Sequence, residues 1–220
     1  FSFDSLNQIK RLKKSFSNDN LGIQAILTGQ GFSKDGSYHY TSLITSKSSK
    51  DSQFKNTLNM VENGDRPFLF GSIPNQALIQ RACSAINLIR NNTSSLILIS
   101  PPFSPAVWNK INTNDNFSYI EKSYKILQKC LNQKIYNYHN PNILKPSSEC
   151  EFIDGFHGGD TLYGRLLINL SSKEESVKNY LNMEKLAAFV DDNNGNAGGV
   201  TKILFPGIQE NDFLGLGCNK

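Results

Sequence analysis

The chain contains two amphipathic segments that are each followed by a short β-prone run, and this repeated order limits the fold more than any other feature. Pro74 opens a segment whose apolar residues recur at helical spacing, and residues 96–99 follow it as a continuous apolar run. Helical periodicity returns at residues 117–131, and residues 134–138 form a second β-prone run. The order predicts an α/β fold, and the unbroken apolar run at 96–99 indicates a central parallel strand covered on both faces.

This order predicts a three-layer α/β/α architecture with a mainly parallel sheet. In such sheets a ligand lies beyond the carboxyl ends of the strands. Here those ends correspond to residues 100–104, residues 138–142 and the loop that contains Asp154. We therefore expect these three loops to converge on one site.

The bulk properties favour one α/β domain that spans residues 1–220. With 38% hydrophobic residues, a chain of 220 residues can bury a substantial core. Residues 17–66 are rich in Ser, Lys, Asn and Gly, which indicates a long irregular excursion. Further helices are predicted over residues 4–16, 161–170 and 175–190, with Asp160 as the cap of the helix that begins at residue 161.

Charge and local motifs argue against several classes of function. The net charge of +4 arises from 23 Lys and Arg against 19 Asp and Glu spread along the chain, so no basic stripe indicates a nucleic-acid partner. No apolar run approaches the roughly 20 residues that a membrane-spanning helix needs. The glycine-containing loop at residues 31–37 lacks the G-x-x-x-x-G-K-[ST] pattern of a phosphate-binding loop. The glycine-rich residues 195–199 do not connect a strand to a helix, as a dinucleotide-binding loop must. We therefore expect no nucleotide and no other cofactor.

The four cysteines do not have the spacing of a metal site. Cys83, Cys130, Cys150 and Cys218 form no C-x-x-C pair and have no histidine at ligand spacing. Cys83 falls inside a predicted helix, so we expect it to be buried and free. The other three lie near the ends of predicted elements, where a disulfide can form.

Asp154 and His157 have the spacing of a carboxylate that orients an imidazole. A serine hydrolase needs a nucleophile, an imidazole that takes its proton, and a carboxylate that fixes the tautomer of that imidazole. On the glycine-rich loop of residues 154–160, the Asp154 carboxylate can fold back onto one ring nitrogen while the other nitrogen faces a cleft. Gly155, Gly158 and Gly159 are expected to permit the tight backbone that this requires.

The block Phe-Ile-Asp-Gly-Phe-His at residues 152–157, followed by a predicted helix, resembles the last Asp-x-x-His block of the SGNH (GDSL-like) hydrolase superfamily. The strand expected at 96–99 runs into Ser-Pro-Pro at residues 100–102. This strand end resembles one found in the envelope-associated branches of the superfamily, which include D-alanyl-transfer and polysaccharide O-acetylation proteins. The resemblance implies a flavodoxin-like fold, with Asp154 as the orienting carboxylate and His157 as the base.

The same resemblance implies an esterase or acyltransferase that acts on an acylated carbohydrate or a cell-envelope polymer. It also implies a periplasmic or cell-envelope location and a membrane-associated partner protein. The resemblance implies neither a cofactor nor a metal ion.

The nucleophile block of this superfamily is not found in the chain. The superfamily places its serine in a Gly-Asp-Ser block on the first strand, whereas the closest match here, residues 64–66, ends in arginine. Phe1-Ser2-Phe3 resembles the end of a strand, so we expect the first strands and the nucleophile to precede Phe1. Ser72, Ser100 and Ser104 are internal candidates, although helix caps and turn residues are the more common use of such serines.

Other interpretations of these residues stay open at this level. Asp154 can be a loop residue that accepts backbone hydrogen bonds, with His157 on the surface. The chain can then be a non-catalytic SGNH-like module that binds or assembles. His139 is expected at the surface of a strand end. A metal site that combines it with Asp154, His157 and Asp160 is the less favoured alternative, because it needs a tertiary geometry that the sequence does not show. Aromatic residues near the predicted cleft can stack on a sugar ring or pack in the core, and they are Phe103, Trp108, Tyr136 and Tyr138.

Overall fold

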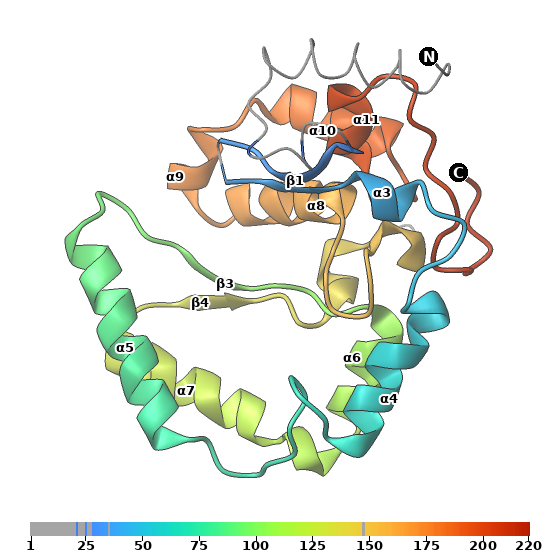
Figure 1. Cartoon of the computed structure of the whole chain (residues 1–220). Helices are drawn as coiled ribbons and strands as arrows, with labels where there is room; N and C mark the ends of the chain where they lie inside the picture. The colour runs from blue at the N-terminus through green and yellow to red at the C-terminus, as the bar shows by residue number, and fades with distance from the viewer. Residues whose placement is uncertain (1–20, 22–24, 26–27, 35, 147) are drawn as a thin grey trace. The chain divides into compact units, whose positions relative to one another are not determined.

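The computed structural model describes residues 21, 25, 28–34, 36–146 and 148–220 (Figure 1). These residues form two compact units. The first unit contains the described residues up to Gln53, together with 146–153 and 159–220, and the second contains 54–145 and 154–158. The helix expected at 4–16 lies outside the described residues. In the part of the chain that is described, no helix has both the length and the apolar character needed to cross a bilayer.

The second unit contains a pair of parallel strands whose apolar surface faces two helices. In this sheet Leu98 is opposite Ile135 and Ser100 is opposite Asn137. Figure 1 shows α5 and α7 side by side beneath the strands, and the Cys83–Cys130 disulfide joins these two helices. The elements are α4 (Lys55–Asn63), α5 (Gln76–Asn91), β3 (Leu98–Ser100), α6 (Pro105–Asn112), η2 (Asp115–Phe117), α7 (Tyr119–Leu131), β4 (Ile135–Asn137) and η3 (Pro141–Leu144).

The expected helix-then-strand order is confirmed twice in this unit, and the fold is mixed α/β. The three-layer architecture is not confirmed, because the described residues form only two sheets of two strands each. In the described chain β3 pairs with β4 alone, and Ile99 on β3 is 40% exposed, so the expected central position of this strand is not observed. A run of apolar residues predicts burial, but it does not determine how many neighbours a strand has.

The first unit is mainly helical and packs around α8 (Asp160–Ser171), which contacts α9, α10, α11 and η4. Leu162, Leu166 and Leu170 are buried at a spacing of four residues, so one face of α8 supplies the core of this unit. The other elements are β1 (Gln30–Phe32), β2 (Tyr38–Tyr40), α3 (Thr41–Ile44), η1 (Ser52–Phe54, shared with the second unit), η4 (Glu149–Glu151), α9 (Glu175–Lys178), α10 (Met183–Asp192) and α11 (Gly199–Leu204).

Three local predictions differ from the structure. The 17–66 segment contains the antiparallel β1–β2 pair and helices α3 and α4, so its described part is more regular than its composition indicated. The helix expected at 175–190 is divided into α9 and α10 because the Asn182 side chain accepts from the Lys185 N–H and starts a new helix. Asp160 is the first residue of α8, but its carboxylate accepts from the Val200 N–H and thus caps α11.

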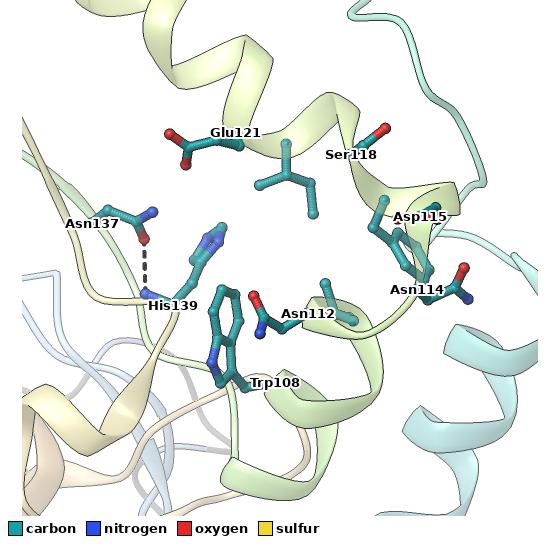
Figure 2. A pocket seen from close by; sticks show the side chains of 11 residues that line it. Trp108, Asn112, Asn114, Asp115, Ser118, Glu121, Asn137 and His139 are labelled. Atoms are coloured by element: carbon teal, nitrogen blue, oxygen red, sulfur yellow. Dashed lines mark hydrogen bonds between the residues drawn. The ribbon is translucent and has the colours of Figure 1, made fainter.

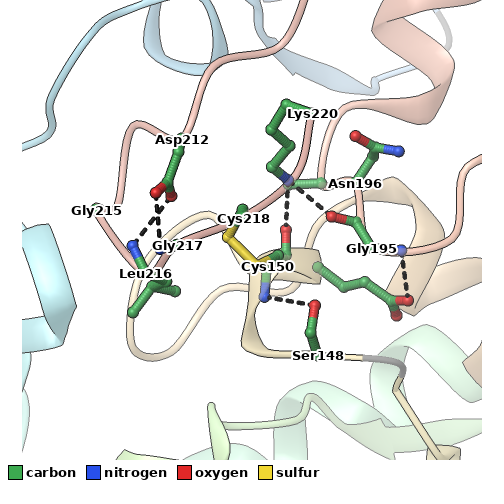
Figure 3. Close-up of a disulfide and its surroundings, with 12 residues drawn as sticks. Ser148, Cys150, Gly195, Asn196, Asp212, Gly215, Leu216, Gly217, Cys218 and Lys220 are labelled. Atoms are coloured by element: carbon green, nitrogen blue, oxygen red, sulfur yellow. Dashed lines mark hydrogen bonds between the residues drawn. A yellow bond between two sulfur atoms is a disulfide. The ribbon is translucent and has the colours of Figure 1, made fainter.

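Each disulfide lies within a single unit. Cys83–Cys130 is in the second unit, and Cys150–Cys218 is in the first. The expectation of a free Cys83 is therefore wrong, because its position on α5 faces Cys130 on α7. Figure 3 shows the Cys150–Cys218 bond beside the buried ammonium group of Lys220. That group donates to Glu210 at 2.6 Å and to the carbonyl oxygens of Cys150 and Gly195 at 3.0 and 2.8 Å. Burial lowers the pKa of Lys220, although Glu210 partly offsets this effect.

Candidate active site

The Asp154 carboxylate organises both the backbone of its loop and the ring of His157. One oxygen, Oδ1, accepts from the N–H groups of Phe156 and His157 at 2.9 and 2.8 Å. The other, Oδ2, lies 2.8 Å from Nδ1 of His157. A carboxylate that accepts backbone N–H groups two and three residues ahead is typical of an Asx turn. The turn therefore fixes the distance at which the same carboxylate meets the imidazole.

This contact determines the tautomer of His157. A carboxylate only accepts hydrogen bonds, so Nδ1 carries the proton and Nε2 of the neutral ring has a free lone pair. The pKa of His157 is raised above its ordinary value: the hydrogen bond that the ring donates to Asp154 raises it most, burial lowers it, and the negative charge of Asp154 raises it further. The side chain of His157 is 47% exposed and that of Asp154 is 24% exposed. The contact with Asp154 thus orients a ring that stays half-exposed.

Gly155 places this loop against two helices because it has no side chain. A Cβ at Gly155 would lie 2.6 Å from the Thr57 side chain of α4, closer than real Cβ contacts allow. The Gly155 carbonyl oxygen also accepts from the Ser104 N–H at the start of α6. Gly155 is not among the residues with positive φ, and Gly159 has a φ of −86°. The expected reason for these glycines was therefore wrong, since close packing and not backbone conformation requires Gly155.

The three loops expected to converge do so within the second unit. The Phe103 N–H donates to the His139 carbonyl oxygen at 3.3 Å, which joins the loops that follow β3 and β4. The Ser104 N–H donates to Gly155 at 3.0 Å, which joins the β3 loop to the Asp154 loop. The first of these contacts follows from the parallel β3–β4 pair, because parallel strands end at the same edge.

An aromatic cluster connects the two histidines of this region. The ring of Phe156 lies 4.2 Å from that of His157, and Phe68 contacts both Phe156 and Phe103. Phe103 in turn lies 4.5 Å from His139. Sequence reasoning placed Phe103 near the cleft but did not identify Phe68, since the short Phe68-Leu69-Phe70 run carries no spacing that indicates a role.

His139 lies in a partly buried hydrogen-bonded group, not at the surface position expected for it. Its Nε2 lies 3.0 Å from the Tyr124 hydroxyl, and that hydroxyl donates to Ser100. Nδ1 of His139 is buried without a hydrogen-bond partner. Burial lowers the pKa of His139 to about 4, so the ring is neutral near pH 7.

The three internal serine candidates have other contacts. Ser104 is fully buried, and its side chain caps α6 by accepting from the Val107 N–H. Ser100 is buried and accepts from Tyr124. Ser72 is exposed, and its carbonyl oxygen accepts from Lys122. Among the described residues, no side chain makes a hydrogen bond to Nε2 of His157.

Figure 2 shows a cavity of about 220 Å³ that His139 helps to line. Its polar residues come from the end of α6, from η2 and α7 with the residues that cap them, and from the end of β4 with His139 after it, while Trp108 supplies an aromatic wall. Sequence reasoning named Trp108 and His139 but not the asparagines and carboxylates around them, because they lie in four separate elements. Within the described residues, no group of three or more His, Cys, Asp or Glu side chains has the arrangement of a metal site.

Comparison of the chain with protein-family models, with curated proteins and with solved structures found no match.

Proposed function

We propose that the protein is an SGNH-like esterase or acyltransferase that acts on an acylated carbohydrate or a cell-envelope polymer. The observation that carries the proposal is the 2.8 Å contact between Asp154 Oδ2 and His157 Nδ1, which prepares Nε2 as a general base. The exposure of the His157 ring supports this role, because a base must reach the group that it deprotonates.

In this mechanism a serine hydroxyl attacks the acyl carbonyl carbon while Nε2 of His157 accepts the hydroxyl proton. His157 then gives that proton to the leaving alcohol, and the acyl group remains on the serine. Water or the hydroxyl of an acceptor then attacks the acyl-serine while His157 accepts its proton, and His157 returns that proton to the serine oxygen as the serine–acyl bond breaks. Asp154 holds the ring and stabilises its protonated form throughout.

Two disulfides in one chain support the proposed periplasmic or cell-envelope location, because disulfides persist in oxidising compartments. The membrane-associated partner belongs to the same proposal. It rests on the resemblance of residues 152–157 and of the Ser-Pro-Pro at residues 100–102 to the envelope-associated branch.

A second candidate is a non-catalytic SGNH-like module that binds or assembles. The observation in its favour is that, in the described residues, no serine is hydrogen-bonded to Nε2 of His157. Ser104 donates its backbone N–H to Gly155 of the Asp154 loop, but its hydroxyl oxygen accepts from the Val107 N–H. The two candidates differ in whether a reactive serine exists.

A fluorophosphonate probe, which labels activated serines, distinguishes them when applied to the protein expressed from its complete reading frame. We expect the unaltered protein to be labelled and His157→Ala to lose labelling by at least about a hundredfold, because general-base catalysis contributes roughly 10²–10⁴-fold. Asp191→Asn on an exposed part of α10 is the control and should be labelled normally. An unlabelled parent protein favours the binding module, and unchanged labelling of a folded His157→Ala variant rejects His157 as the base.

A further inference from the structure

The cavity shown in Figure 2 has the size of a site for one small ring. Its volume of about 220 Å³ lies below the roughly 300–1,000 Å³ of pockets that hold drug-sized ligands. It lies wholly in the second unit, as do Asp154 and His157. The contacts among His139, Phe103 and Phe68 connect it to the ring of Phe156 beside His157.

Trp108 gives the cavity a flat apolar wall among polar groups. Its indole lies next to the ring of His139, with 6.3 Å between centroids, and Ile111 and Ile120 extend the apolar part of the lining. An aromatic ring with polar groups around it suits a ligand that has one apolar face and a polar edge. The C–H face and the hydroxyl rim of a pyranose sugar have this arrangement.

The polar side chains around the cavity have hydrogen-bonding capacity left for a ligand. Asn114 and Asn137 each use Oδ1 to accept a backbone N–H, from Asn116 and from His139 respectively. Their Nδ2 groups take part in neither of these bonds. Asn112 at the end of α6 is exposed and adds one more amide. Amides that donate and accept suit hydroxyl groups, which also do both.

The charge of the cavity is negative. Asp115 and Glu121 line it, and none of its lining residues, all in the described part of the chain, is Lys or Arg. Glu121 has an ion pair with Lys125 at 3.7 Å, but both side chains are exposed and Lys125 is not part of the lining. His139 is neutral near pH 7 and adds no positive charge. An anionic ligand is therefore disfavoured, while hydroxyl and ammonium groups fit.

We propose that this cavity binds one pyranose ring that carries no acidic group, with its C–H face on Trp108 and its hydroxyls on Asn112, Asn137 and the two carboxylates. The binding proposal stands on the cavity alone. Its link to acyl transfer, in which this ring would belong to the acylated substrate or to the acceptor, rests on the proposed function.

Trp108 is the only tryptophan of the chain, so its fluorescence reports directly on the cavity. The test is a titration of the intact protein with glucose, glucosamine and glucuronate, which share one ring and differ in charge. We expect a saturable fluorescence change with glucose and glucosamine, and binding of glucuronate at least tenfold weaker. Sorbitol, an open-chain polyol without a ring face, should also bind at least tenfold more weakly than glucose.

Two matched variants locate the binding. Asn112→Ala should weaken glucose binding about three- to tenfold, the effect of one lost neutral hydrogen bond. Asn109→Ala, on the same helix but outside the cavity, should bind like the parent protein. Trp108→Ala, measured by calorimetry, should bind glucose at least tenfold more weakly while the disulfide-linked unit keeps its circular dichroism spectrum.

The proposal is overturned if neither glucose nor glucosamine gives a saturable change, or if glucuronate binds as well as glucose. Equal binding by Asn112→Ala and Asn109→Ala would place the sugar outside this cavity and would also overturn it. His157→Ala should keep full glucose affinity. Failure of sugar binding is therefore separate from failure of serine labelling, and each proposal can be rejected without the other.

Discussion

At Asp154 the two oxygens of one carboxylate have separate functions. Oδ1 holds the N–H groups of Phe156 and His157 and so builds the turn, whereas Oδ2 holds the His157 ring. An asparagine at this position could still accept with its oxygen, but it would carry no charge to stabilise the imidazolium form. The geometry of the pair and its electrostatics therefore depend on different properties of the same residue.

The residue-scale prediction concerns the titration of the two histidines of the second unit. We expect NMR to show a pKa of His157 above its ordinary value of 6.5 and a pKa of His139 near 4. Asp154→Asn should lower the pKa of His157, since the Asp154 contact raises it while burial lowers it, and should leave the pKa of His139 unchanged. A His157 pKa that does not respond to Asp154→Asn would contradict the assigned contact.

The two shifts have opposite effects on stability with pH. His157 favours the protonated form in the fold, so its contribution is fully present below about pH 6.5 and is lost as pH rises through its raised pKa. His139 favours the neutral form, so its contribution is present above pH 6.5 and is lost as pH falls towards 4. As a general base, His157 is active only above its pKa, so serine labelling should increase with pH through that value.

At the scale of the element, the start of α6 is where the β3 loop and the Asp154 loop are held together. Ser104 accepts from the Val107 N–H with its side chain and donates its own N–H to Gly155. Ser104 was a candidate nucleophile in the sequence, but in the structure it is fully buried and stabilises the start of α6. Ser118, which precedes α7, has the same position relative to its helix but makes no such cap.

This difference predicts the effect of two alanine substitutions on the second unit. Ser104→Ala should lower the free energy of unfolding by about 1–2 kcal/mol, because it removes a cap and leaves a buried N–H without a partner. Ser118→Ala should change it by less than about 0.5 kcal/mol. Urea unfolding followed by Trp108 fluorescence measures both, since this residue lies in the second unit. Equal effects of the two substitutions would contradict the assigned cap.

At the scale of the whole molecule, each compact unit contains one disulfide. Cys83–Cys130 closes a separation of 47 residues in the second unit, and Cys150–Cys218 closes one of 68 residues in the first. Long closed loops remove conformational freedom from the unfolded chain, by a model-dependent amount of about 2–4 kcal/mol each. In the first unit the carbonyl oxygen of Cys150 also accepts from the Lys220 ammonium group at 3.0 Å (Figure 3).

We predict that each disulfide stabilises mainly its own unit. Replacement of Cys83 and Cys130 by serine should increase amide hydrogen exchange in α5 and α7, and replacement of Cys150 and Cys218 should increase it in η4 and α8. Hydrogen exchange read by mass spectrometry on peptides from both units measures this. The same increase in both units for either pair of substitutions would contradict the assignment, as would free thiols in the unreduced parent protein.

The sequence by itself determined the local features. Apolar spacing predicted α5 and α7, a capping residue predicted α8, and the β-prone runs predicted β3 and β4, because each of these signals is local to one element. The Asp154–His157 contact was also predictable, since an Asx turn spans only three residues.

Only the tertiary structure decided which distant groups meet. It paired Cys83 with Cys130, directed the Asp160 carboxylate to α11 and buried His139 beside Tyr124. It also gathered the lining of the Trp108 cavity from four elements and placed Gly155 against Thr57. None of these contacts has a local periodicity, because they depend on how separate elements pack. Packing is set by the summed burial of many side chains, which no short stretch of sequence contains.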